Sequence, residues 1–315
     1  MASAARLTLV LGLSSLWQAV SGYTDVFSHR FIFRNFDPPL NPAHISLYTA
    51  SLTGLFSIYY LRRETGTSLP ATGRAVNVAL AGGVLEVSSG VANEFYHQVI
   101  EGFYPSAPLH FAIHASFVVS MLVVSLGCLL ASVSVSASGL PAWKGFSFSF
   151  SSLWLLLIGS VSYLIALAPQ SVSGPLYLSV CSFLVSLISA PVLSSAPRPG
   201  SVTLAAAVWL AVNGALILYF TGIRLFVPYP VLAAAAVEYS SLKLRKYVHV
   251  SSGAAIGVAS FWLFYPYSFE LLGGAAQTLI LSAVLAALSG VLGSLAGVGA
   301  GRSVAGRIVP GVFSP

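Results

Sequence analysis

The chain has 315 residues, of which 57% are hydrophobic and 7% are charged. A soluble globular domain carries about 25% charged residues, so this composition excludes a soluble fold. The formal net charge of +6 is explained by membrane topology, as argued below, and gives no reason to expect a nucleic-acid partner.

Apolar segments long enough to cross a hydrocarbon core of about 30 Å recur from one end of the chain to the other. The sequence therefore predicts an all-α, polytopic membrane bundle of about ten transmembrane helices. We place the spans at residues 5–28, 41–61, 72–96, 107–137, 147–168, 174–194, 202–222, 225–242, 249–268 and 274–299.

The basic residues predict the orientation of these spans. If the N-terminus is cytoplasmic, eleven of the 14 Lys and Arg residues fall on the cytoplasmic side, and only Arg30, Arg34 and Arg224 fall on the other. Positive charge accumulates in cytoplasmic loops of membrane proteins. We therefore expect a multi-pass protein of the cell membrane with both termini in the cytoplasm.

The distribution of ionisable residues divides the chain into four parts. Residues 1–137 hold four spans arranged as two hairpins, and residues 138–146 form a linker. Residues 147–301 hold six further spans with few ionisable groups, and residues 302–315 form a tail. Five of the six histidines and six of the eight acidic residues lie between residues 25 and 114. The functional chemistry is therefore expected in the first part.

The two hairpins repeat one motif. The first hairpin has Asp25 and His29, then fourteen residues, then His44. The second has Asn93 and His97, then twelve residues, then His110, with His114 one turn beyond. Residues four apart lie on one face of a helix, and each short loop can return a third ligand to the same depth. The pattern predicts one or two metal sites at the extracytoplasmic face.

Histidine with an oxygen ligand suits copper, iron or zinc, and ligand type alone leaves these three open. In the second set Glu94 is an alternative donor to Asn93, because a neutral amide is a weak ligand, and His114 is a reserve ligand. We expect the first set to bind metal more strongly, and we assign the chemistry to Asn93, His97 and His110.

Glu86 is a separate signal. It precedes His97 by eleven residues, which places it about 16 Å deeper along a helix. A carboxyl group inside the bilayer is costly and is a functional candidate. We expect Glu86 to act as a proton relay or as a support for the second site; a structural, hydrogen-bonded glutamate is the alternative.

The two motifs resemble the C subunit of the copper membrane monooxygenases, the particulate methane and ammonia monooxygenases, over residues 23–114. Asp25, His29 and His44 resemble one ligand set of that subunit, and Asn93, His97 and His110 resemble the other. The resemblance implies copper ligation and a role in oxidising a small apolar substrate with dioxygen. It also implies that activity depends on other membrane subunits.

Two further functions stay open at this stage. One is a haem- or quinone-linked electron-transfer subunit, because histidines from facing helices at one depth can serve as axial ligands of haem. The other is a metal or ion transporter, or a metal-insertion protein, in which duplicated hairpins move around a cation site. The partners we expect are the lipid bilayer, other membrane subunits or a second copy of the chain, and a small apolar substrate or quinone.

Overall fold

The computed structural model describes residues 2–31, 42–65, 69–100, 107–166, 174–193, 198–221 and 276–308, with a few single positions between 231 and 255. Every regular element in these ranges is a helix, which confirms the all-α prediction. The helices are α1 (Ala2–Phe31), α2 (Pro42–Thr65), α3 (Pro70–Phe95), the π-helix η1 (Tyr96–Ile100), α4 (Ala107–Ala137), α5 (Trp143–Ala166), α6 (Gly174–Leu193), α7 (Ser201–Thr221) and α10 (Ala276–Ile308). The predicted spans at 225–242 and 249–268 lie almost wholly outside the described residues.

Within the described part of the chain, three helical segments are long and apolar enough to cross a membrane: Pro70–Ile100, Ala112–Ala137 and Ala283–Ala300. A shorter apolar helix covers Ser201–Leu216. A hydrophobic helix of about 20 residues matches the thickness of the bilayer core. These helices indicate a membrane protein.

The chain forms two compact units. The first contains Met1–Leu156 and Ala215–Ile223, and the second contains Leu157–Gly214 and Arg224–Pro315. The beginning of α5 therefore packs with the four N-terminal helices. The functional residues predicted from the sequence all belong to the first unit.

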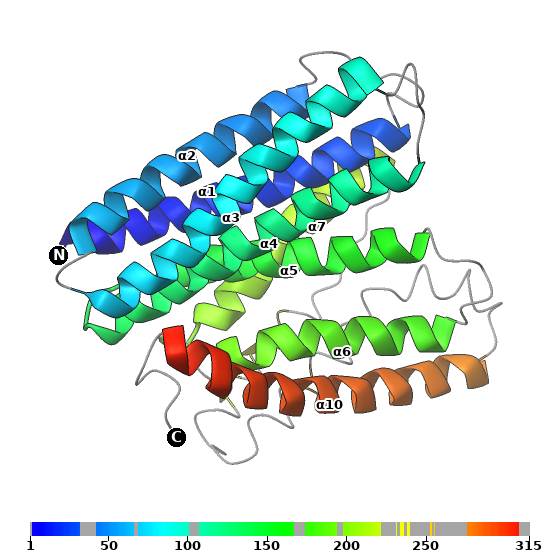
Figure 1. The fold of residues 1–315 in the computed structure, drawn as a ribbon. Helices are drawn as coiled ribbons and strands as arrows, with labels where there is room; N and C mark the ends of the chain where they lie inside the picture. The colour runs from blue at the N-terminus through cyan, green and yellow to red at the C-terminus, as the bar shows by residue number, and fades with distance from the viewer. Residues whose placement is uncertain are drawn as a thin grey trace. The chain divides into compact units, whose positions relative to one another are not determined.

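In the first unit, α1 to α4 form an antiparallel ring in which each helix contacts its neighbours (Figure 1). Matched contacts at two levels of each pair establish the direction. Between α1 and α2 these are Ser3–Glu64 and Trp17–Ser46; between α3 and α4 they are Thr72–Ser134 and Ser89–Ser116. Since the helices alternate in direction, the end of α1, the start of α2, the end of α3 and the start of α4 lie at one end of the bundle. We call this the site end.

Small residues let the helices approach closely. A Cβ atom on Gly127 of α4 would clash with the backbone of Ala79 on α3, and one on Gly82 would lie 2.7 Å from the amide nitrogen of Val124. Where α1 meets α5, a Cβ on Gly12 would lie 2.6 Å from the carbonyl oxygen of Gly145. Such contacts replace the hydrophobic effect as the source of helix association in lipid.

The first unit buries many polar side chains beside its apolar core and exposes many large apolar ones. The buried polar side chains of α1 include Ser14, Ser15, Gln18, Ser21 and Asp25, and those of α2 and α3 include His44, Ser51, Ser57, Glu86, Ser89 and Asn93. Exposed side chains of the same helices include Leu13, Trp17, Leu52, Phe56, Val84, Leu85 and Val91. Buried polar groups together with large exposed apolar side chains are typical of a bundle surrounded by lipid.

In the second unit, Gly293 and Gly297 of α10 pack directly on the backbone of Phe183 and Leu187 of α6. At the start of α7, the carboxylate of Glu238 accepts hydrogen bonds from the amide nitrogens of Gly200 (3.0 Å) and Val202 (2.9 Å), and Thr203 adds its amide and hydroxyl. A carboxylate is favourable at this position because the first amide groups of a helix have no partner within it.

Candidate metal centre at the site end of the bundle

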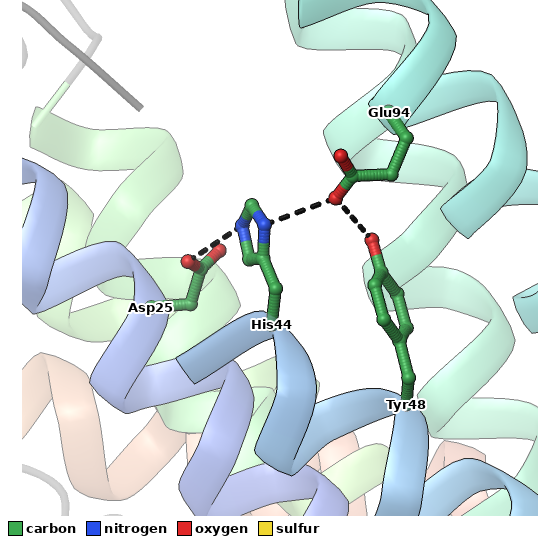
Figure 2. A network of polar contacts seen from close by, with 4 residues as sticks. All are labelled: Asp25, His44, Tyr48 and Glu94. Carbon is green, nitrogen blue, oxygen red and sulfur yellow. Dashed lines mark hydrogen bonds and ion pairs between the residues drawn. The ribbon is translucent and has the colours of Figure 1, made fainter. Parts of the chain in front are cut away.

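The structure brings together one residue from α1, two from α2 and one from α3 (Figure 2). His44 lies in the middle of this group. Its Nε2 atom is 2.9 Å from Oδ1 of Asp25, and its Nδ1 atom is 3.0 Å from Oε1 of Glu94. The hydroxyl of Tyr48 donates a hydrogen bond of 2.6 Å to the same Glu94 oxygen. One imidazole ring therefore joins two carboxylates that come from different hairpins.

Burial differs between the two sides of the ring. His44 and Asp25 are buried, with exposed fractions of 4% and 7%. The side chain of Glu94 is 35% exposed. Both ring nitrogens of His44 therefore face carboxylate oxygens, one buried in the bundle and one partly exposed.

Neighbouring contacts hold α1 and α2 in the register that this group needs. One turn deeper, the hydroxyl of Ser46 is hydrogen-bonded to that of Ser21 (2.8 Å) and to the indole nitrogen of Trp17 (2.9 Å). On α3, a Cβ at Gly90 would lie 3.2 Å from Cε1 of Tyr48. The absence of a side chain at Gly90 therefore makes room for the Tyr48 ring, which supports Glu94.

The helix that carries the second predicted ligand set changes its geometry between Asn93 and His97. The sequence treats Asn93 and His97 as neighbours on one regular α-helical face, but α3 ends at Phe95 and His97 lies in the π-helix η1. Single π-helical turns are rare and occur often at functional sites. The ring of His97 is 5.8 Å from the ring of His114 on α4, centroid to centroid, in an edge-to-face contact. His114 therefore lies in direct contact with His97, a member of the second predicted set.

Asn93 and Glu94 separate in the structure. Glu94 points to the first hairpin and joins His44, whereas Asn93 is buried and its Oδ1 atom has no hydrogen-bond partner among the described residues. Consecutive residues of a helix point about 100° apart, so only one of the two can face α2. The backbones of His29 and His110 belong to α1 and α4, but their side chains lie outside the described part of the structure.

Among the described side chains, no three His, Cys, Asp or Glu residues form a complete metal site. Whether a metal fits is therefore tested by the distance between the donor atoms of Asp25 and His44. Two donors bound to one ion at about 2.0–2.2 Å lie roughly 2.8–3.6 Å apart at right-angled to tetrahedral geometry. The 2.9 Å between Asp25 Oδ1 and His44 Nε2 fits two neighbouring ligands of one ion.

Glu86 lies deeper in the bundle and is only 1% exposed. Its Oε1 atom accepts a hydrogen bond of 2.6 Å from the hydroxyl of Ser51 on α2. Its Oε2 atom has no hydrogen-bond partner among the described residues. The structure therefore places Glu86 on the inner face of α3, separate from the group around His44.

The structure gives a role to two further residues. Tyr48 occupies the position in the first hairpin that His114 occupies in the second, and its hydroxyl supports Glu94. Gln18 belongs to neither motif, although it is 1% exposed within an apolar helix. The signal that could have found Gln18 is the polar stripe of α1, since Ser14, Gln18, Ser21 and Asp25 recur at intervals of three and four residues.

No family model matches this chain, and no similar curated protein or solved structure was found.

Proposed function

We propose that the chain is an integral membrane metalloprotein with about ten spans and cytoplasmic termini, and that it binds a transition metal at the extracytoplasmic end of its N-terminal bundle. Copper is the metal we favour. In this proposal the protein is an oxidoreductase subunit of the monooxygenase type. The buried pair of Asp25 and His44, with Glu94 behind the imidazole ring, is the observation that carries it.

The hydrogen-bond partners of His44 support a metal site. Histidine ligands of metals almost always donate their other ring N–H to a carboxylate, a carbonyl or water, which fixes the ring and makes it a stronger ligand. Here Glu94 accepts from Nδ1 and is itself held by Tyr48, so Nε2 is the nitrogen that faces Asp25. A metal ion would be held by His44 and Asp25.

His29 is the proposed third ligand. It follows Asp25 by four residues on α1, and residues at this spacing lie on one helical face. With one carboxylate and two neutral histidines, the ligand set would neutralise one of the two charges of a divalent ion. Such a set leaves coordination positions open for a small molecule.

The second cluster is proposed to act beside this site. Asn93, His97, His110 and His114 would form it, with η1 setting the position of His97. A bound copper ion would supply the redox chemistry, and the residues of the chain would position the ion and hold protons. The apolar surface of the bundle would let a membrane-dissolved substrate or quinone approach from the lipid.

The test is metal content after purification without chelators, followed by titration of the metal-free protein with copper, zinc or iron. We expect about one ion or more per wild-type chain and loss of the first-site ion in His44→Ala. Glu94→Gln should weaken binding by about 10- to 100-fold, because it removes the carboxylate that orients the ring. Glu64→Gln is the matched control, since Glu64 is exposed and hydrogen-bonded to Ser3 at the opposite end of α2.

A wild-type protein that binds none of the three metals would overturn the proposal. Equal metal content in the wild type and His44→Ala would show that the ions bind elsewhere. An absorption spectrum with a strong Soret band would favour a haem protein instead. Metal-dependent ion flux in proteoliposomes would favour a transporter.

A further inference from the structure

The interior of the first unit contains two polar atoms that the described residues leave without a hydrogen-bond partner at the same depth. They are Oε1 of Gln18 on α1 and Oε2 of Glu86 on α3. Both side chains are 1% exposed. A buried polar atom without a partner costs about 1–3 kcal/mol, and in native proteins such an atom is commonly hydrogen-bonded to a buried water molecule.

The depth of Gln18 and Glu86 below the group around His44 follows from the number of residues that separate each from that group along its own helix. Gln18 precedes Asp25 by seven residues, and Glu86 precedes Glu94 by eight. At about 1.5 Å per residue these offsets are roughly 10 Å and 12 Å below the group around His44. The two oxygens are therefore at nearly one level.

Contacts with α2 also place Gln18 and Glu86 at the same level of the bundle. The amide nitrogen of Gln18 donates a weak hydrogen bond of 3.4 Å to the carbonyl oxygen of Ala50, and Ser51 donates to Glu86. Ala50 and Ser51 are consecutive, so Gln18 and Glu86 lie on either side of one turn of α2. Since α1 and α3 each pack against both α2 and α4, they lie diagonally across the ring, and the buried side chains of Gln18 and Glu86 both belong to its interior.

Both atoms are oxygens, and what they need is a hydrogen donor. The amide oxygen of Gln18 can only accept, and the second carboxyl oxygen of Glu86 can accept or carry a proton. A water molecule has two O–H donors and can also accept, so it satisfies both atoms. Buried water typically makes about three hydrogen bonds to groups of this kind.

We propose that Gln18, Ser51 and Glu86 line an internal water site, and that this water carries protons between Glu86 and the site end of the bundle. A hydronium ion arriving along the water transfers one proton to Oε2 of Glu86, which leaves a neutral carboxyl group and neutral water. The reverse step returns the proton, and no electrons move. Asn93, about 10 Å above Glu86, offers the next buried acceptor on α3 in its Oδ1 atom.

Intramembrane carboxyl groups that contact water are the usual stations of proton paths in pumps and transporters. This role requires no metal, so the metal-free protein can test it. Its failure would leave the metal proposal intact, and loss of metal binding would leave this proposal intact.

The experiment is infrared spectroscopy of the full-length, metal-free protein in lipid, exchanged rapidly from H₂O into D₂O. The difference between wild type and Glu86→Gln isolates the carboxyl band of Glu86, because glutamine has a similar shape and no acid proton. We expect that band to be present in wild type and to shift on exchange. Gln18→Leu should slow the shift by about tenfold, the effect of losing one hydrogen bond to the water.

Ser15→Ala is the matched control. Ser15 lies on the same helix and is buried, but its hydroxyl is already bonded to those of Ser125 (2.8 Å) and Ser152 (2.9 Å). It should leave the exchange rate unchanged. The proposal is wrong if Glu86 shows no carboxylic acid band, if that band does not exchange, or if Gln18→Leu exchanges at the wild-type rate.

Discussion

The group around His44 predicts an unusual result for double variants of the metal-free protein. His44→Ala removes one partner of the Asp25 carboxylate, and that carboxylate is buried, with 7% of the residue exposed. Loss of one partner from a buried ion pair costs about 3–5 kcal/mol, much of it from the charge left behind. Removing that charge as well should restore part of the stability, so His44→Ala with Asp25→Ala is expected to be about 1–3 kcal/mol more stable than His44→Ala alone.

The other carboxylate should behave differently. The side chain of Glu94 is 35% exposed, and it keeps its hydrogen bond from Tyr48 when His44 is removed. Ion pairs near solvent contribute about 0–1 kcal/mol. Adding Glu94→Ala to His44→Ala should therefore give no recovery of stability and a further loss of at most about 1 kcal/mol.

The assay is equilibrium unfolding in mixed micelles with a denaturing detergent, followed by tryptophan fluorescence and with a chelator present. The quantity compared is the free energy of unfolding of the two double variants relative to His44→Ala. Glu64→Ala, at the opposite end of α2, controls for the general effect of losing an acidic residue. Equal recovery by both second changes, or recovery with Glu94→Ala only, would refute the assignment of Asp25 as the buried partner.

Two further predictions concern the scaffold. Gly127→Val should separate α3 from α4 and destabilise the first unit by about 1–3 kcal/mol or more, since the valine side chain would meet the backbone of Ala79. Gly73→Ala is the control, because there is open space around Gly73, and it should have little effect in the same unfolding assay. Glu238→Gln should cost about 1–3 kcal/mol and speed amide hydrogen exchange in the first turn of α7, where the carboxylate accepts backbone hydrogen bonds; unchanged exchange at Val202 would contradict this interpretation.

Sequence alone was sufficient for the class of fold and for the end of the bundle at which the ionisable groups gather. Apolar segments of this length must form helices in a membrane, because a helix satisfies its backbone hydrogen bonds within the segment. Short loops then make consecutive helices antiparallel, so Asp25, His44, Glu94 and His114 come to the same end. The number of spans and the identity of a metal are still predictions.

The tertiary structure decided which of these side chains meet. Asn93 and Glu94 are neighbours in sequence, and a rotation of α3 by about 100° would exchange their roles. Packing at small residues, including Gly82 and Gly90, fixes that rotation and turns Glu94 toward His44 on the other hairpin. Hydrophobic periodicity could not supply this information, because it reports which face of a helix is buried but not which neighbour that face contacts. For the same reason only the packed bundle shows that Gln18 and Glu86 lie at one level.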